Sequence, residues 1–326
     1  MIVTRTPLRI SFCGGGTDLP SYFLENGGCV VSTSIDKYIY ISMNDSFHRG
    51  RNILKYSEIE DTYNINHIKH PIIRESMRRY GVSGIELNST SDIPAGTGMG
   101  SSSSFTVGMI NGLRAYRGLG STKGDLAEGA CDLEINVLKE DIGYQDQYAA
   151  AYGGLNYIEF RKDGTVSVEP IGLTLEQKRS MSDNLMLFYL GGTRSASKVL
   201  KSYSGNTTSL KSKKDALVNL ARRLRDELNR GDISYLGKNL YEGWNIKKSM
   251  SSSISSEEID EAYQLALDNG AVGGKLLGAG GNGFLLIYAE ERERDAVREA
   301  MRGYSEMPFD FESEGSKVIY NDKGQV

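Results

Sequence analysis

Residues 91–105 read Ser-Asp-Ile-Pro-Ala-Gly-Thr-Gly-Met-Gly-Ser-Ser-Ser-Ser-Phe, a glycine and serine loop between two regular elements. Residues 84–90 before it alternate apolar and polar side chains, as a strand does. Pro94 disfavours a helix at the residue before it. After the loop, apolar residues recur at the spacing of one helix face, at Phe105, Met109 and Leu113. The sequence therefore predicts a strand, a tight loop and a helix that ends near residue 117.

Such a loop is suited to holding an anion. Glycine lets the backbone adopt positive φ and lets a phosphate approach closely, and the first amides of a helix have no partner within it. Serine hydroxyls can donate to phosphate or bind Mg²⁺. A flexible Gly/Ser connection is the alternative. The common P-loop is excluded because no Lys-Ser/Thr pair follows the last glycine, and the dinucleotide fingerprint is excluded by the glycine spacing. The candidate phosphate-binding residues are Gly96, Thr97, Gly98, Met99, Gly100, Ser101, Ser102 and Ser103.

Length and composition narrow the class of protein. A chain of 326 residues favours two domains, and 39% hydrophobic and 25% charged residues are typical of a globular protein. A net charge of −4 argues against a partner that is nucleic acid or a membrane surface. No apolar run approaches the ~18 residues of a membrane helix, and the N-terminus reads as a strand and not as a signal peptide.

The cysteines and histidines predict a reduced interior without zinc. Three widely spaced cysteines, with no CxxC pair, read as buried apolar side chains in a cytoplasmic protein, at Cys13, Cys29 and Cys131. Three histidines make a zinc site improbable. Strands are expected at 2–10, 28–43, 155–160, 166–170, 184–190 and 284–288, and helices at 67–80, 209–230, 232–250, 256–269 and 290–303. Residues 45–66 are expected to be irregular, and 172–183 to join the domains.

Two further glycine clusters flank charged residues. Gly14-Gly-Gly16 follows the first strand and precedes Thr17 and Asp18, while Arg9 lies within the strand. Asp18 fits either an ordinary Asx-turn or a carboxylate that binds substrate hydroxyls. Arg9 fits either a solvated strand residue or a cation that reaches a cleft. The other cluster, residues 273–283, leads into a buried strand, and the helix–strand pattern around it predicts an α+β sandwich.

Two carboxylates stand twelve residues apart across a glycine break. Glu134 lies beside a predicted buried helix stripe, which consists of Leu126, Ala130, Leu133 and Val137. Asp146 begins a short alanine-rich helix after Gly143. Glu134 fits a surface carboxylate and Asp146 fits a helix N-cap. Alternatively, both converge on one cleft.

Three glycine motifs in this order resemble those of the GHMP kinases. Residues 7–18 are similar to the first motif of that superfamily, 94–104 to its ATP phosphate loop with Met99 where Leu is usual, and 275–283 to its third. The resemblance implies an α+β fold of two domains. Residues 1–180 would form an ATP-binding domain like domain 2 of ribosomal protein S5, and residues 181–326 a ferredoxin-like domain.

Within the superfamily, Gly-Gly-Gly-Thr-Asp18 and the run 145–154 most resemble the bacterial D-glycero-D-manno-heptose 7-phosphate kinases, and next the fucokinase domain. Galactokinases carry Glu-His where Gly15 and Gly16 stand here, so two sugar contacts are missing and a different sugar is implied. The implied reaction phosphorylates the anomeric hydroxyl of D-glycero-D-manno-heptose 7-phosphate to the 1,7-bisphosphate, with ATP and Mg²⁺, for nucleotide-activated heptose used in surface glycans such as capsule or lipopolysaccharide.

The resemblance also implies residue roles. Asp146 would be the catalytic base, Arg9 the cation beside the attacking hydroxyl, and Ser102 and Glu134 the Mg²⁺ ligands. The sugar would contact Asp18 and the glycine turns, namely Gly15, Gly16, Thr17, Gly280 and Gly281.

A phosphorylated acceptor needs further cations. Arg194, Lys198 and Lys275 are the candidates, although each fits a solvated surface charge equally well. Two rivals stay open, namely a fucokinase-like kinase of a free sugar and a sugar- or nucleotide-binding regulator without activity. The expected partners are ATP and a sugar phosphate, and the expected assembly is a monomer or a homodimer.

Overall fold

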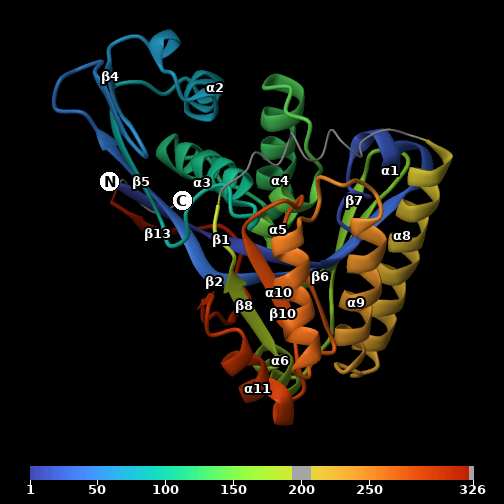
Figure 1. Cartoon of the computed structure of the whole chain (residues 1–326). Helices are drawn as coiled ribbons and strands as arrows, with labels where there is room; N and C mark the ends of the chain where they lie inside the picture. The colour runs from blue at the N-terminus through green and yellow to red at the C-terminus, as the bar shows by residue number, and fades with distance from the viewer. Residues whose placement is uncertain (193–206, 323–326) are drawn as a thin grey trace.

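The computed structural model describes residues 1–192 and 207–322, which form two sheets with helices packed against them (Figure 1). In these residues nine strands form the first sheet, in the order β13-β1-β2-β5-β3-β4, with β6, β7 and β12 attached through β2. All neighbours are antiparallel except β3 and β5. Its strands are β1 (Ile2–Cys13), β2 (Gly28–Asp45), β3 (Asn52–Lys55), β4 (Ile59–Thr62), β5 (Ile85–Ser91), β6 (Leu155–Phe160), β7 (Val166–Pro170), β12 (Phe311–Glu312) and β13 (Lys317–Asn321).

The helices of the first half pack on one another and on the two central strands. α3 and α5 contact both β1 and β2, and α4 contacts α3 and α5. α3 carries Phe105, Met109 and Leu113 into the core, as its spacing predicts. These elements are α1 (Pro20–Asn26), η1 (Ile65–His67), α2 (Pro71–Tyr80), α3 (Ser101–Tyr116), α4 (Lys123–Cys131), a π-helical turn η2 (Asp132–Val137) and α5 (Gln145–Tyr152).

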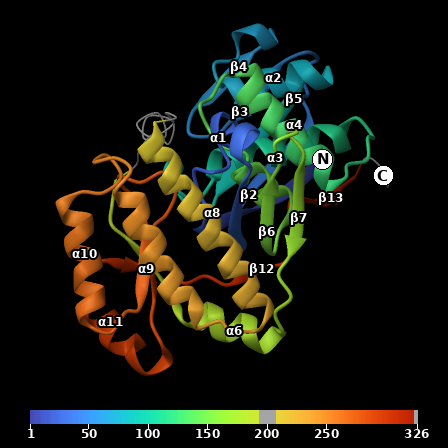
Figure 2. The ribbon, with the colours of Figure 1, turned by 90° about the vertical axis from the view of Figure 1, so that its right-hand side faces the viewer.

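The second sheet is antiparallel, with the order β11-β8-β10-β9. α9 packs on β9 and β10, whereas α8 packs on α9 and also on β1 and β2, so this helix pair joins the two halves (Figure 2). The elements are α6 (Leu175–Asp183), β8 (Leu185–Tyr189), α8 (Thr208–Asn229), α9 (Tyr235–Lys248), α10 (Glu257–Asp268), β9 (Gly273–Leu276), β10 (Phe284–Tyr288), η3 (Glu291–Glu293), α11 (Arg294–Ala300) and β11 (Ser305–Glu306).

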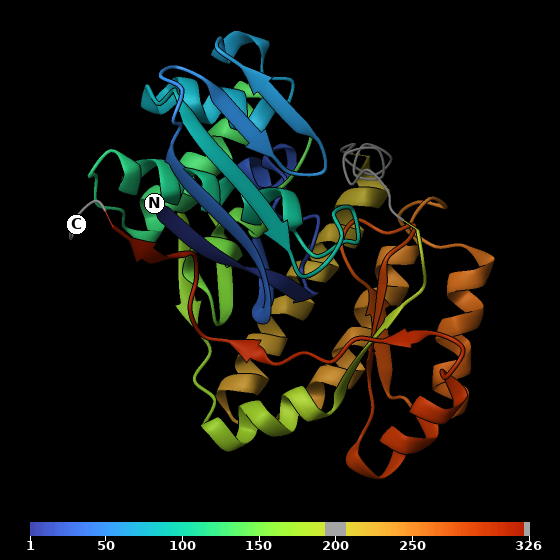
Figure 3. The same ribbon diagram turned by 90° about the vertical axis from the view of Figure 1, so that its left-hand side faces the viewer.

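The last strands cross back to the first sheet. β11 still pairs with β8, but β12 pairs with β2, and β13 pairs with β1 as an edge strand. Figure 3 shows this segment running from the second sheet to the side of the molecule where the chain begins. The first sheet is therefore built from both ends of the sequence, although the expected division placed all of 181–326 in a second domain.

Three regions differ from the sequence-based expectation. Residues 45–66 contain the paired strands β3 and β4 and the short helix η1 instead of an irregular loop. Residues 175–183 form helix α6, which begins with a capping box at Thr174. Val137 is 44% exposed because the stripe that it was expected to continue ends in the π-helical turn.

The predicted core is otherwise confirmed. The leucines of α8 at 217, 220, 224 and 228 are buried, and the three cysteines are buried and unpaired in disulfides. Among the described residues, no helix is both long and apolar enough to cross a bilayer.

Candidate active site

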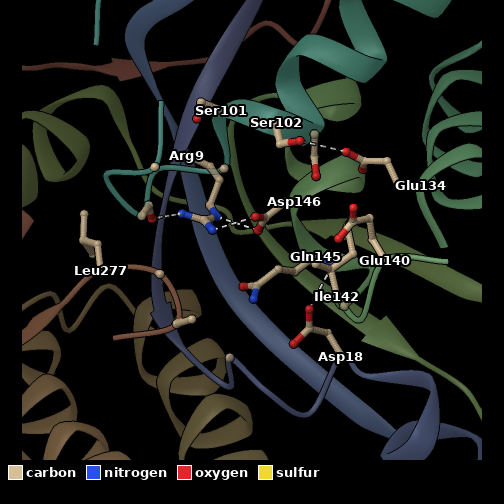
Figure 4. Close-up of a pocket in the computed structure, with 18 of the residues that line it drawn as sticks. Arg9, Asp18, Ser101, Ser102, Glu134, Glu140, Ile142, Gln145, Asp146 and Leu277 are labelled. Carbon is tan, nitrogen blue, oxygen red and sulfur yellow. Dashed lines mark hydrogen bonds and ion pairs between the residues drawn. The ribbon is translucent and has the colours of Figure 1, made fainter. Parts of the chain in front are cut away.

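A cavity of about 460 Å³ brings together segments that lie far apart in the sequence. Its walls come from the turn after β1, the loop before α3, the η2–α5 segment, α9 and the loop after β9 (Figure 4). All three glycine motifs contribute to it. Of the predicted site residues, those lining it are Arg9, Gly15, Gly16, Asp18, Gly96, Gly98, Gly100, Ser101, Ser102, Ser103, Glu134, Asp146 and Gly280.

The loop before α3 packs directly against the third glycine motif. A Cβ on Gly98 would lie 2.6 Å from the carbonyl oxygen of Leu277, and one on Gly278 would lie 2.6 Å from the Cα of Gly98. Both glycines also have positive φ, +84° and +72°. Backbone meets backbone here, so no side chain fits between the two halves of the molecule at this wall.

Gly98→Ala is therefore expected to destabilise the protein more than an equivalent change elsewhere. Gly118 is the matched control, because it has a φ of +68° and no atom within 4 Å of a Cβ. Gly118→Ala should cost about 1–2 kcal/mol from its backbone conformation alone. Gly98→Ala should cost a further ~1–3 kcal/mol because Leu277 must move. Urea unfolding measures the free energy of unfolding of both variants. Equal losses in the two would show that the close approach of Gly98 to Leu277 does not contribute to stability.

The first turn of α3 offers free amides to the cavity. The helix begins after Gly100, which has φ +74° and cannot cap the helix with a side chain. The first-turn amides, those of Ser101 to Ser103, therefore have no acceptor within the helix, and the helix dipole makes this end favourable for an anion. Thr97 and Met99, which were also predicted to bind phosphate, do not line the cavity. Both side chains are fully buried, and the Thr97 hydroxyl donates to the carbonyl of Pro94.

Arg9 and Asp146 form a two-pronged ion pair in the cavity. Arg9 Nε and Nη2 donate to the two carboxylate oxygens of Asp146 at 2.7 and 2.8 Å, and Nη1 donates to the carbonyl of Gly98 at 2.7 Å. Arg9 is 3% exposed, so it is not a solvated strand residue. Asp146 lies in the first turn of α5, but Tyr144 occupies the N-cap position. The carboxylate therefore faces the cavity next to the glycine loop.

Glu134 is a buried carboxylate held by neutral donors. It is 1% exposed, which excludes a surface role. Its Oε1 accepts from Thr106 at 2.9 Å and from Ser102 at 3.3 Å, and its Oε2 accepts from Gln147 at 2.6 Å. Burial raises its pKa to about 7. π-Helical turns such as η2 often occur at functional sites, and this one places the carboxylate beside the start of α3.

Asp18 lies below Gln145 and Asp146 in the view of Figure 4, whereas Glu134 lies above them. It is buried, and its carboxylate accepts from the amides of Gly16 at 2.8 Å and Gln145 at 3.2 Å. A Cβ on Gly143 would lie 1.8 Å from Asp18, so only glycine fits there. Burial and the charge of Asp146 both raise the pKa of Asp18.

Some predicted sugar contacts lie elsewhere. The Thr17 hydroxyl donates to the carbonyls of Gly14 and Cys29, so this fully buried side chain braces the turn from beneath. Gly281 does not line the cavity, and its amide donates to Ile254. Arg194 and Lys198 lie outside the described residues.

Sequence reasoning missed three side chains of the site. Lys247 on α9 lines the cavity, and Thr106 and Gln147 hold Glu134. Gln147 belongs to the Gln-Asp-Gln run that the resemblance already singled out. Its position next to Asp146 could therefore have indicated that Gln147 lies in the site. Lys247 stands in no glycine motif and could be placed only by the packing of α9 against β9.

Comparison with known proteins places the chain in a family. Residues 66–154 match the model of the GHMP kinases N terminal domain, and residues 224–305 match that of the GHMP kinases C terminal. A D-glycero-alpha-D-manno-heptose 7-phosphate kinase from Campylobacter jejuni subsp. jejuni serotype O:2 is 30% identical over 336 residues, which cover 97% of this chain and 98% of that protein.

Two further similarities agree with this family assignment. An L-fucokinase/L-fucose-1-P guanylyltransferase from Bacteroides fragilis is 24% identical, and the match covers 90% of this chain but 35% of that protein. The crystal structure of a D-glycero-D-manno-heptose 1-phosphate kinase from Bacteroides thetaiotaomicron superposes with a TM-score of 0.80, at 24% identity, over 98% of this chain and 100% of that one. The expected two-domain fold is thereby confirmed, and the chain belongs to the GHMP kinase family of phosphotransferases.

Proposed function

We propose that the protein transfers the γ-phosphoryl group of ATP to the anomeric hydroxyl of D-glycero-D-manno-heptose 7-phosphate, producing the 1,7-bisphosphate and ADP. The observation that carries the proposal is the Arg9–Asp146 pair beside the free amides of α3, since it sets a carboxylate next to a phosphate-binding loop. The choice of sugar is supported by the full-length similarity to the Campylobacter jejuni kinase.

The loop before α3 would hold the nucleotide. Ser101, Ser102 and Ser103 of the first turn of α3 line the cavity, and Gly96, Gly98 and Gly100 line it without a side chain in the way. Phosphoryl transfer depends on positioning and charge neutralisation more than on covalent chemistry. The preorganised amides therefore provide much of what the reaction requires.

Ser102 and Glu134 would hold Mg²⁺. A hydroxyl and a carboxylate are the hard oxygen ligands that this ion prefers, and here they are in contact. Glu134 is buried with no cation within 4 Å among the described residues, so an ion would supply the positive charge that its burial lacks. When bound, Mg²⁺ neutralises charge on the nucleotide phosphates.

Asp146 would act as the general base. As the anomeric oxygen bonds to the γ-phosphorus, its proton passes to the Asp146 carboxylate, and the bond from phosphorus to the ADP oxygen breaks so that ADP leaves with that electron pair. Arg9 fixes the orientation of the carboxylate through two hydrogen bonds. An anomeric hydroxyl is more acidic than an ordinary alcohol, so a carboxylate is a sufficient base.

The opposite wall would receive the sugar. Asp18 can accept hydrogen bonds from sugar hydroxyls, and Gly15 and Gly16 line the cavity beside it without side chains. A larger sugar than galactose would have room there, because the Glu-His pair of galactokinases is replaced by these glycines. The similarity to the Bacteroides fragilis fucokinase makes a free sugar the second candidate.

Coupled measurement of ADP release tests the proposal. The acceptors are D-glycero-D-manno-heptose 7-phosphate, the corresponding 1-phosphate, and free mannose, fucose and galactose, each with ATP and Mg²⁺. Turnover with the 7-phosphate at least about tenfold above any other is the expected result. Preference for a free sugar would keep the kinase and overturn the acceptor, whereas nucleotide binding without any turnover would favour a regulator.

A further inference from the structure

Two buried lysines come from the second half of the molecule. Lys247 comes from α9 and Lys275 from β9, and they are 5% and 6% exposed. The ammonium group of Lys275 donates to the carbonyls of Ser11 and Phe12 at 2.7 and 3.3 Å, and this residue does not line the cavity. Lys275 therefore braces β1 from the second half of the molecule.

Lys247 is placed differently, because it lines the cavity. Its Nζ donates to the carbonyl of Gly278 at 2.6 Å. An ammonium group has three donors, so this bond leaves capacity for a ligand. The residues that line the cavity next to Gly278 are Ala279 and Gly280 of the third glycine motif, which lies across the cavity from Ser102 and Glu134 (Figure 4).

The charges at this wall do not balance. In residues 1–192 and 207–322, no carboxylate lies within 4.0 Å of the Nζ of either lysine, and the charge of Arg9 is already matched by Asp146. Because Asp146 is paired with Arg9, Asp18 is the other buried carboxylate whose negative charge raises the pKa of Lys247. Burial and the nearby Arg9 lower the pKa of Lys247 to about 8, and burial and Lys247 lower that of Lys275 to about 7. Lys247 therefore lies buried beside other cationic groups and has no carboxylate of the described part of the chain in contact with it.

An uncompensated buried charge is costly unless a ligand supplies its partner. On the other wall, Glu134 is a buried negative charge without a cationic side chain in contact among the described residues, and it is suited to binding a cation. We propose that Lys247 binds the phosphate group that the acceptor already carries, and that it thereby makes the enzyme prefer a phosphorylated sugar. This inference rests on the proposed function for the site, and it identifies a phosphate monoester as the chemical class recognised.

Lys247→Met tests the inference, because it keeps an unbranched side chain, one atom shorter, and removes its charge. For the heptose 7-phosphate, KM should rise by about 10- to 100-fold, which is the worth of a hydrogen bond to a charged group, while KM for ATP is unchanged. For the free heptose, kcat/KM should stay within a factor of about three. Lys248→Met is the matched control, since that neighbour is paired with Asp260 at 2.9 Å and should leave both acceptors unaffected.

Other outcomes would overturn the inference. Equal losses with the phosphorylated and the free sugar would mean that Lys247 only positions Gly278. A rise in KM for ATP, or a fall in kcat at unchanged KM values, would mean that it contacts the transferred phosphoryl group instead. Lys247→Arg should retain the preference for the phosphorylated sugar, and it serves as the test if the methionine variant does not fold.

A binding measurement separates this inference from the choice of sugar. With Mg²⁺ and a non-hydrolysable ATP analogue bound, the γ-phosphate position is filled. Calorimetry should then detect inorganic phosphate binding to the wild-type protein, and this binding should be at least about tenfold weaker in Lys247→Met. The control variant Lys248→Met should show no such loss. Phosphate binding that is the same with and without Lys247 would overturn the inference, whereas failure to phosphorylate any heptose phosphate would overturn only the proposed function.

Discussion

Asp146→Asn is expected to lower kcat by about 10²–10⁴-fold, the usual contribution of a general base. The amide has nearly the same shape as the carboxylate but cannot take the hydroxyl proton. Arg9 keeps its bond to the carbonyl of Gly98, so the loop should hold its position. Calorimetry with Mg²⁺ and an ATP analogue should therefore show nucleotide affinity within a factor of about three of the wild type.

Asp163→Asn provides the control for this change. Asp163 lies in the exposed turn between β6 and β7, where it accepts from Thr165 and has no part in the cavity. The Asp163→Asn substitution should leave kcat unchanged. If Asp146→Asn retained kcat within tenfold of the wild type, Asp146 would not be the base.

Glu134→Gln is expected to lower kcat/KM for the nucleotide by about 10²–10³-fold, since metal charge stabilisation is worth several kcal/mol. The amide retains the size of the side chain but loses the charge that would bind Mg²⁺. Metal binding can be followed apart from activity, by calorimetric titration of Mg²⁺ in the presence of ADP. In Glu134→Gln, the affinity for Mg²⁺ should fall together with kcat/KM.

Glu140→Gln is the matched control, because Glu140 also lines the cavity but its side chain is exposed. It should change Mg²⁺ affinity by less than about threefold. Equal effects of the two substitutions would remove Glu134 as the metal ligand and point to the general negative charge of the cavity.

The metal requirement should also depend on pH. Burial raises the pKa of Glu134 to about 7, so the carboxylate is mostly ionised at pH 8 and mostly protonated at pH 6. A protonated carboxyl group does not bind Mg²⁺ well. The Mg²⁺ concentration for half-maximal rate should therefore rise about tenfold between pH 8 and pH 6. Glu134→Gln should lose this dependence, and its persistence in that variant would assign the titration to another group.

The strand, loop and helix around residues 91–105 could be predicted because their signals are local. Pro94, alternate glycines and a 3.6-residue apolar period each act over a few neighbouring residues. The convergence of Arg9 and Asp146 had no such signal, since 137 positions separate them. The roles proposed for them came from resemblance to a family, and the structure adds the distances that physical reasoning about the site requires.

Other elements had weak or conflicting signals. β4 has a polar sequence because it is an edge strand with a solvent-facing side, and α6 is a polar helix with two buried residues. Both read as loops when hydrophobic periodicity is the main criterion. Lys247 could not be assigned either, because a lysine on an amphipathic helix is ordinarily solvated, and only the packing of α9 buries it.

The return of the C-terminal strands to the first sheet has a consequence for synthesis. β1 is made first but lacks its neighbour β13 until residue 321 has been added, and β2 likewise waits for β12. While the second sheet is being translated, the edge of β1 stays unpaired, and such edges favour wrong pairing and aggregation. A ribosome-bound chain that stops after β11 should therefore be more sensitive to protease within the first sheet than the finished protein. The order of translation would then make the half that carries the glycine and serine loop among the last parts of the enzyme to become fully stable.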